Sequence, residues 1–199
     1  MPHRLFIAIR PPAPVRDALI DAMEGVEGAR WQNEDALHVT LRFIGEVETP
    51  AANDLAGQLS QIDWPAFELR VAGVGAFERK GSPHTIWARV PHSEPLEGLR
   101  QKVERACDLA GLGRETRRFT PHITLARLDR AAGPIGAWLS AHGDLAAGPW
   151  MAEAFVLYES HLGHTGAHYE AVATYPLRNG SVPEGGDADA IEPLRRFPL

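Results

Sequence analysis

A seven-residue segment occurs twice in this chain and constrains its fold more than any other feature. The first copy is Leu-His-Val-Thr-Leu-Arg-Phe at positions 37–43, and the second is Pro-His-Ile-Thr-Leu-Ala-Arg at positions 121–127, 84 residues later. Each copy lies in a run typical of a β-strand and follows a strand and a helix. A period this long is not that of a solenoid, so it predicts two halves related by a pseudo-twofold axis.

Alternation along a strand assigns the two sides of each copy. Residues i and i+2 share one face of a strand, so His38 and Thr40 are expected together on one side, with the apolar residues on the other. The same alternation groups His122 with Thr124. The apolar sides then face a core, and two imidazoles and two hydroxyls converge on one cleft.

Strands and helices alternate along the rest of the chain. We expect strands at 5–9, 37–44, 67–77, 85–90, 121–128, 150–158 and 167–174, and helices after Pro12, behind an N-cap at Thr49, from Ser93, and over 134–140. This order favours an α+β fold of two pseudo-symmetric lobes, each with an antiparallel sheet and flanking helices around a central cleft. One bilobal domain is expected over 1–178, and a flexible tail over 179–199, where Gly, Pro and Asp are frequent.

Composition and charge exclude several classes of protein. No stretch approaches the roughly 18–20 apolar residues of a membrane span, no signal-peptide layout is present, and the single cysteine, Cys107, excludes an internal disulfide. A cytoplasmic location is the simplest expectation. The net charge of −6 argues against a broad basic surface for duplex nucleic acid. Five arginines between 114 and 130 nevertheless form a local basic patch that suits one phosphate group, or else a solvated face.

Two facing histidines suit acid–base chemistry on a phosphodiester. Hydrolysis of a cyclic phosphodiester needs a base for water and an acid for the departing oxygen, and a histidine with its ordinary pKa of about 6.5 can serve as either. Threonine hydroxyls and a nearby arginine would hold the non-bridging oxygens. Each copy offers one metal ligand with no companion at ligand spacing, so neither a metal nor another cofactor is expected. The two copies are too alike to say which histidine is the acid.

The chain resembles the two-histidine phosphoesterase superfamily, specifically its RNA 2′,3′-cyclic phosphodiesterase branch, also known as RNA 2′-5′ ligases. The resemblance spans residues 3–177 and rests on segments at 4–9, 37–47, 118–127, 158–160 and 175–177, with Phe77, Pro83, Trp87 and Tyr169 between them. It implies hydrolysis of RNA ends that carry a 2′,3′-cyclic phosphate to 2′-phosphomonoesters. Ligation of such ends to 5′-hydroxyl ends, giving 2′-5′ linkages, would be the same chemistry with another nucleophile.

The resemblance also implies a role for each residue of the repeat. His38 would be the proton donor to the leaving ribose oxygen, and His122 the proton acceptor from water. Thr40 and Thr124 complete the expected catalytic set.

Outside the catalytic set, Arg127 is implied as a phosphate ligand, and Phe43 is expected either to stack on a base or to pack in the core. The expected partner is RNA ending in a 2′,3′-cyclic phosphate, such as a tRNA fragment or an oligonucleotide. No membrane and no obligate protein partner are implied.

Three points stay open at this stage. Phe43 and Arg127 each lie five residues after their histidine, so ideal alternation puts them on the apolar face unless the strands bend. Relatives commonly have arginine after Pro83, where this chain has His84, so His84 is not part of the expected site; Trp87 is expected in the core. The alternative functions are turnover of a cyclic nucleotide or 2′-5′ oligonucleotide by the same fold, and non-catalytic binding of phosphate-ended RNA.

Overall fold

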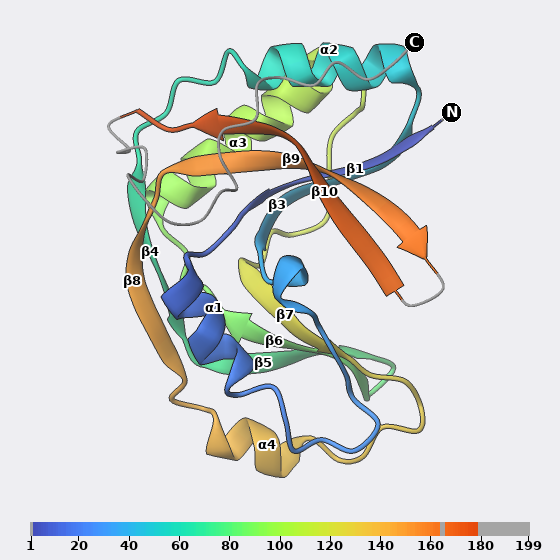
Figure 1. Cartoon of the computed structure of the whole chain (residues 1–199), viewed down its shortest axis with the longest axis vertical. Helices are drawn as coiled ribbons and strands as arrows, with labels where there is room; N and C mark the ends of the chain where they lie inside the picture. Colours follow the sequence, from blue (N-terminus) through green and yellow to red (C-terminus); the bar gives the residue numbers. More distant parts are fainter. Residues whose placement is uncertain (1, 164–165, 179–199) are drawn as a thin grey trace.

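The computed structural model, which describes residues 2–163 and 166–178, consists of two antiparallel sheets flanked by helices (Figure 1). The larger sheet has the order β10-β9-β1-β3-β7-β6-β5, with β2 beside β7, and the smaller sheet pairs β4 with β8. The strands are β1 (His3–Ile9), β2 (Arg30–Trp31), β3 (Val39–Val47), β4 (Phe67–Ala72), β5 (Val74–Arg79), β6 (Ser82–Arg89), β7 (His122–Arg127), β8 (Ala146–Ala152), β9 (Ala154–Gly163) and β10 (Gly166–Pro176). The helices are α1 (Ala13–Ile20), the 3-10 helix η1 (Glu34–Ala36), α2 (Thr49–Leu59), α3 (Glu94–Leu109) and α4 (Gly136–Ala141).

This architecture confirms the α+β fold with antiparallel sheets that the sequence predicted. Two expected strands are each divided: the first breaks between β4 and β5 at Gly73, whose φ of 89° is in the left-handed region, and the second between β8 and β9. The predicted tail over 179–199 lies outside the described residues. Among the described residues, no helix is long and apolar enough to span a membrane.

Two helix starts illustrate where sequence patterns succeed and fail. Ser93 caps α3 as expected, with its Oγ accepting a hydrogen bond of 3.4 Å from the Leu96 amide. The expected cap at Thr49 is wrong, because the N-cap position of α2 is Glu48, without a side-chain capping bond. The Thr49 hydroxyl instead lies 3.0 Å from Nε2 of His3, at the start of β1.

The two copies of the repeated segment meet in the middle of the larger sheet. β3 and β7 pair antiparallel through Val39 and Ile123, the central residues of the two motifs, and both side chains are fully buried. β1 pairs with β3 on one side of this junction, and β6 pairs with β7 on the other. The pseudo-twofold relation therefore passes through the Val39–Ile123 pair.

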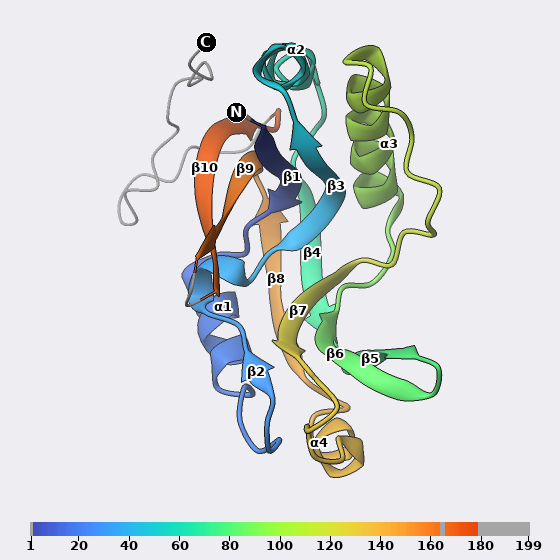
Figure 2. The same ribbon diagram turned by 90° about the vertical axis from the view of Figure 1, so that its right-hand side faces the viewer.

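The helices cover the sheet across the boundary between the halves. α3 follows β6 in the second half, but it packs against β3 of the first half and lies beside α2 (Figure 2). α1 follows β1 in the first half and packs against β8, below α2 and α3 in the view of Figure 1. Side chains from both halves consequently form one continuous hydrophobic core.

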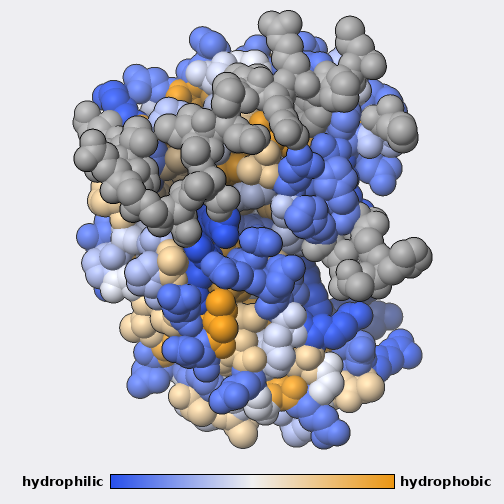
Figure 3. Space-filling model, viewed as in Figure 1, coloured by the Kyte–Doolittle hydropathy of each residue, from blue (hydrophilic) through white to orange (hydrophobic). Residues whose placement is uncertain are grey.

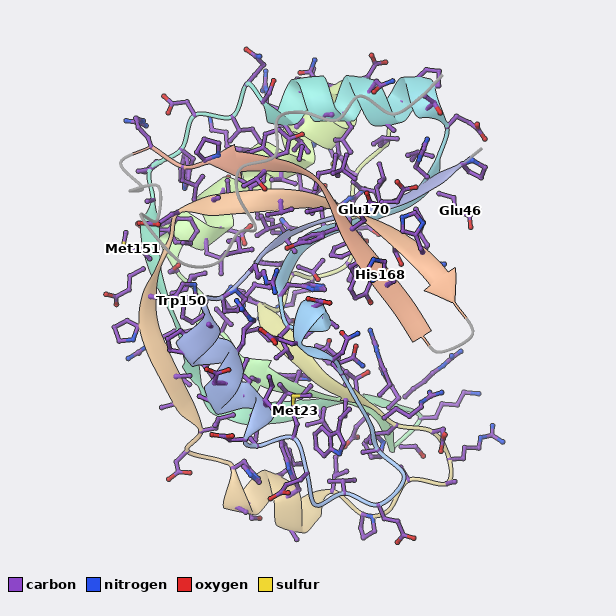
Figure 4. The ribbon with its side chains drawn as sticks, viewed as in Figure 1. Met23, Glu46, Trp150, Met151, His168 and Glu170 are labelled. Atoms are coloured by element: carbon purple, nitrogen blue, oxygen red, sulfur yellow. The ribbon has the colours of Figure 1, made fainter. Side chains whose placement is uncertain are left out.

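Strand alternation separates this core from the opposite face. In β8, Trp150 is buried in the core while its neighbour Met151 is half exposed, and the two side chains point in opposite directions (Figure 4). β1 is buried on both faces: Leu5, Ile7 and Ile9 belong to the main core, whereas Phe6 and Ala8 join a second cluster with Val156 and Tyr158. That second cluster lies on the face to which the repeated histidines belong, because Phe6 stacks on His38.

A β-bulge interrupts each copy of the repeat at the same position. Ala8 pairs with Thr40 and Ile7 with Arg42, so Leu41 is an extra residue on β3. In β7, Leu125 is extra in the same way, between residues paired with Trp87 and Ile86. A bulge shifts the alternation by one residue.

The bulges explain how the residues five positions after each histidine reach the histidine face. Beyond Leu41 the side chain of Arg42 is buried and that of Phe43 is 52% exposed, and beyond Leu125 Ala126 is buried and Arg127 exposed. The condition left open by the sequence, that the strands bend before Phe43 and Arg127, is met by a bulge in each strand.

The bulge in β3 also turns Arg42 inward, where it connects β3 to α3 and to the loop before β7. Its guanidinium, 8% exposed, lies 3.4 Å from a Glu104 carboxylate oxygen and 3.9 Å from one of Glu115, and donates to the Gly113 carbonyl at 3.2 Å. This network fixes the segment that leads to His122.

Replacement of Arg42 by alanine should lower the free energy of unfolding by about 2 kcal/mol, because it removes a buried guanidinium that bonds to the half-buried Glu104 carboxylate and to the Gly113 carbonyl. Urea unfolding measures this change. Arg4→Ala, at an exposed position on β1, is the matched control and should change stability by less than about 0.5 kcal/mol. Equal effects of the two variants would contradict a structural role for the Arg42 network.

Candidate active site

The β3–β7 junction brings the two histidines to the same face of the sheet. His38 directly precedes β3 and His122 begins β7. Extending the Val39–Ile123 register by one residue on each side brings His38 level with Thr124, and His122 level with Thr40. Cross-strand neighbours point to the same side, and all four side chains are half-buried. The structure thus groups the four residues that the repeat predicted.

The imidazole of His122 is held in one orientation. Its Nδ1 lies 2.6 Å from the Thr120 carbonyl oxygen, which can only accept, so Nδ1 carries the hydrogen. Phe77 presents its ring edge-on at 4.8 Å between centroids, and the Trp87 ring lies at 5.9 Å. Nε2 is therefore the nitrogen left to exchange a proton with a substrate.

His38 lies against the second hydrophobic cluster. The Phe6 ring stacks on it at 4.8 Å between centroids, Tyr169 approaches edge-on at 5.6 Å, and Tyr158 lies at 6.0 Å. Its Nδ1 is buried and has no well-formed hydrogen bond within the described part of the chain, although the Asp35 backbone is close enough to favour the protonated ring. Like His122, this ring turns Nδ1 toward the protein.

Burial lowers the pKa of both histidines. For His38 burial is the largest cause, the Asp35 backbone opposes it, and the charges of His122 and Arg10 lower the pKa further, to about 4. For His122 burial again lowers the pKa, the Thr120 carbonyl opposes it, and the charge of Arg127 lowers it further. Both shifts favour the neutral imidazole in the free protein.

A hydrogen-bonded group stands beside His122 on β6 and β7. Arg127 pairs across the strands with Thr85, and its Nη1 donates to the Thr85 hydroxyl at 3.1 Å. The Thr85 side chain is buried, and its Oγ1 also lies 2.8 Å from Nδ1 of His84. His84 is exposed and its ring faces that of Phe77 at 6.5 Å. The predicted phosphate ligand, Arg127, therefore does lie at this site, fixed by a threonine.

Phe43 lies at the edge of the His38 side of the site. Its ring is 6.0 Å from that of Phe6, which separates it from His38. Since the side chain is 52% exposed, the expectation that Phe43 packs in the core is wrong. An exposed aromatic ring at the edge of a site is suited to stacking on a planar ligand ring.

Comparison with known proteins places this chain in a family. The model of the 2′-5′ RNA ligase superfamily matches residues 11–164. The chain is 32% identical to an RNA 2′,3′-cyclic phosphodiesterase from Aeropyrum pernix over 80% of its own length and 91% of that protein. The chain belongs to the 2′-5′ RNA ligase superfamily. A protein of the same name from Thermotoga maritima is 28% identical over 90% of this chain and 98% of the relative.

Solved structures agree with this membership. The crystal structure of E. coli LigT in complex with 3′-AMP superposes with a TM-score of 0.73 at 25% identity, covering 89% of this chain and 99% of that one. A Thermus thermophilus protein superposes with a TM-score of 0.72 at 27% identity, covering 88% of this chain and 98% of that one. The resemblance drawn from the sequence motifs is thus confirmed.

In this superfamily member the two halves of the site have the same scaffold but different chemistry. The strand pairings make Phe43 the counterpart of Arg127, and Phe6 the counterpart of Thr85. The His38 side is accordingly aromatic, while the His122 side carries a cation and a hydroxyl. The pseudo-twofold symmetry sets the positions of the side chains around the two histidines. Because the residues at equivalent positions differ, each histidine has a distinct environment.

Several residues that surround the histidines were not in the predicted site. Phe6, Tyr158 and Tyr169 line His38, and Thr85 holds Arg127. Trp87, predicted to be in the core, is indeed buried, yet it also borders His122. Its position depends on Gly75 of β5, where a Cβ atom would lie 2.4 Å from the indole ring. Strand alternation could have identified Thr85 and Trp87, because they share a face of β6, but only once the pairing with β7 was known.

The basic patch expected over 114–130 is partly neutralised. Arg114 pairs with Asp108 at 3.0 Å, and Arg117 with Glu115 at 2.6 Å. Arg127, by contrast, donates to the uncharged Thr85 hydroxyl, which does not neutralise the guanidinium, so its positive charge can attract an anion. Across residues 2–163 and 166–178 no group of three or more histidine, cysteine or acidic side chains could hold a metal ion.

The lowered pKa values predict how the rate depends on pH. Acid–base catalysis needs one histidine protonated and the other neutral, so kcat/KM, which reports the free enzyme, should be bell-shaped. Both apparent pKa values of this profile should lie below about 6.5, the lower one near 4. They describe the titration of the two histidines as a pair and are not assigned to single residues. A bound phosphate anion favours the imidazolium, so the kcat profile should extend to higher pH. Initial rates on a cyclic nucleotide between pH 3.5 and 9 test this, and a kcat/KM maximum above pH 7.5 would contradict it.

Proposed function

We propose that this protein hydrolyses RNA ends carrying a 2′,3′-cyclic phosphate to 2′-phosphomonoesters, by acid–base catalysis between His38 and His122. The observation that carries the proposal is the meeting of the two imidazoles on one sheet face, each with Nδ1 turned toward the protein and Nε2 left for a substrate. The relatives named RNA 2′,3′-cyclic phosphodiesterase support the choice of substrate.

The reaction is an in-line displacement at phosphorus. Nε2 of His122 takes a proton from water as the water oxygen bonds to phosphorus. The bond from phosphorus to O3′ breaks, and protonated His38 gives its Nε2 proton to O3′. Histidines on opposite sides of the phosphorus suit this geometry, and each proton transfer contributes typically ~10²–10⁴-fold in rate.

The protonation state of His38 is coupled to substrate binding. In the free protein its pKa of about 4 disfavours the acid form at pH 7. A phosphodiester anion beside Nε2 favours the imidazolium by direct charge attraction, and thus offsets the effect of burial. His38 accordingly takes up a proton when the cyclic phosphate binds. It is therefore in the form that can donate a proton only when substrate is present.

The remaining residues hold the substrate. The Arg127 guanidinium, aligned by Thr85, binds non-bridging oxygens, where negative charge accumulates in the transition state. The hydroxyls of Thr40 and Thr124, from the centre of the site, add uncharged donors. Phe43 stacks on the base of the terminal nucleoside, whose ribose lies on the His38 side because O3′ receives its proton there. No metal takes part in this scheme, and the location remains the cytoplasm that the sequence suggested.

His38→Ala and His122→Ala should each reduce turnover of an RNA oligomer with a 2′,3′-cyclic phosphate end by at least about 100-fold, because each removes one proton transfer. The assay contains a chelator, and the product is identified as the 2′- or 3′-phosphate. His168→Ala, at an exposed position on β10 (Figure 4), is the matched control and should retain activity. Unchanged thermal unfolding of the three variants separates loss of chemistry from loss of fold.

Three results would count against this proposal. Full activity in either histidine variant would remove the acid–base pair, and activity lost only in chelator would require a metal. Binding of the cyclic end by all variants, without hydrolysis by the wild-type protein, would indicate a binding module.

Phe43→Leu should raise KM for 2′,3′-cyclic nucleotides by about tenfold with little change in kcat, because stacking on a base is worth about 1–3 kcal/mol. Phe43→Tyr keeps an aromatic ring at the same position and should behave like the wild type. Steady-state kinetics on adenosine and cytidine 2′,3′-cyclic phosphates measure both constants. An unchanged KM in the leucine variant would show that the base lies elsewhere.

A further inference from the structure

Arg10 lies beside His38 on the histidine face of the sheet and has no role in the proposed reaction. β1 pairs with β3 up to Ile9 and Val39, and extending this register by one residue brings Arg10 level with His38. Phe6 belongs to the same side of β1, because residues i and i+4 share a face of a strand, and its ring stacks on His38. Arg10 is therefore on the side of the sheet to which substrate binds.

The Arg10 guanidinium is close to His38 and can still be reached from solvent. Its charge lowers the pKa of His38, which agrees with the short separation that the strand register gives. The Arg10 side chain is 26% exposed, and its Nη2 lies 3.5 Å from a carboxylate oxygen of Asp35, whose side chain is 57% exposed. An ion pair this exposed contributes little to stability, so a ligand anion can take the place of Asp35.

Arg89 is the pseudo-twofold counterpart of Arg10. It pairs with His122 from β6, just as Arg10 lies level with His38 on β1. Arg89 is exposed, and its guanidinium carbon lies 5.9 Å from the centre of the Trp87 ring. The fold thus places one arginine beside each histidine. The direction in which the substrate lies decides which of the two an RNA chain passes.

The roles of the histidines set the direction of the substrate. His38 protonates O3′, so the terminal ribose lies on the His38 side, with its base on Phe43. The cyclic phosphate sits on the C2′–C3′ edge of the ribose, with the base at one end of that edge, on C1′, and the 5′ carbon at the other end, on C4′. Along β1, Phe6 is level with Phe43, and Arg10 lies on the other side of Ala8. With the base at Phe43, the 5′ end of the nucleoside is directed toward Arg10.

We propose that Arg10 binds the phosphate on the 5′ side of the terminal nucleoside, and thereby selects RNA ends over cyclic nucleosides. This inference rests on the proposed function, which puts the ribose on the His38 side. The guanidinium donates to the non-bridging oxygens of that phosphate in place of the Asp35 carboxylate. The bound anion also offsets the charge of Arg10, which disfavours the imidazolium of His38. An upstream phosphate therefore promotes both binding and protonation of the acid.

The test compares adenosine 2′,3′-cyclic phosphate with the same compound carrying a 5′-phosphate. The measured quantity is the ratio of their kcat/KM values, because a general effect of a variant on the histidines acts on both substrates. In the wild type the 5′-phosphate should raise kcat/KM by about tenfold or more, the effect of a charge-assisted hydrogen bond. Arg10→Gln should bring the ratio close to one.

Three further variants locate the phosphate. Arg4→Gln makes the same change of charge at an exposed position on the same side of β1, about 20 Å away, and should keep the wild-type ratio. Arg89→Gln should keep it too, because the chain leaves the site on the His38 side. Asp35→Asn removes the competing carboxylate and should raise the ratio by about twofold.

The other outcomes separate this inference from the proposed function. A ratio near one in the wild type, or an unchanged ratio in Arg10→Gln, would overturn the phosphate site and leave the phosphodiesterase intact. A ratio lowered by Arg89→Gln and not by Arg10→Gln would place the upstream chain on the His122 side, and a lower ratio in Asp35→Asn would contradict competition for Arg10. Absence of hydrolysis of both compounds and of an RNA oligomer by the wild type would instead overturn the proposed function itself.

Discussion

The pairing of Val39 with Ile123 is the contact on which the rest of this structure depends. It joins the sheets of the two halves edge to edge, and both side chains are fully buried in the common core. Because the pairing is antiparallel and centred on the middle residue of each motif, it sets the two histidines at equivalent places on one face. The hydrophobic effect on one side of the sheet thereby fixes the geometry of polar groups on the other side. A register shift of β7 by one residue against β3 would turn the His122 imidazole into the core while that of His38 kept its face.

Two bulges then convert a simple repeat into an asymmetric site. The extra residues Leu41 in β3 and Leu125 in β7 shift the alternation of side chains by one position. The residues five positions after each histidine therefore lie on the histidine face. One of these residues is Phe43 and the other is Arg127, so one half offers an aromatic surface and the other a cation. A symmetric pair of histidines could not distinguish a leaving oxygen from an attacking one. The different neighbours make that distinction. On the face of the molecule seen in Figure 3, hydrophilic residues predominate among the described residues, with a narrow hydrophobic strip below the middle.

The sequence was sufficient to predict most helices and strands and the two histidines and two threonines of the site. It was insufficient to predict contacts that depend on which strands pair and in which register. The repeated His-x-Thr-Leu segment predicted the duplication, the strands and the four polar side chains, because the period of a strand is a local property. The position of Thr85, the aromatic surroundings of His38 and the support of Trp87 by Gly75 depend on which strands are neighbours and in which register. The Thr49 cap failed for the same reason, because His3, 46 residues away in the chain, competes for its hydroxyl.

The packing of α3 has a consequence for the origin of such a fold. This helix belongs to the second half by sequence, yet it covers β3 of the first half, while α1 lies far from α2 and α3 and packs on β8. Each half therefore contributes a helix that covers a strand of the other half. A half-length ancestor with this connectivity would have had to exchange helices between two copies, as an intertwined dimer with two identical motifs at its axis. Fusion of the copies would then have freed each motif to change separately, which is the condition that an acid and a base with different neighbours require.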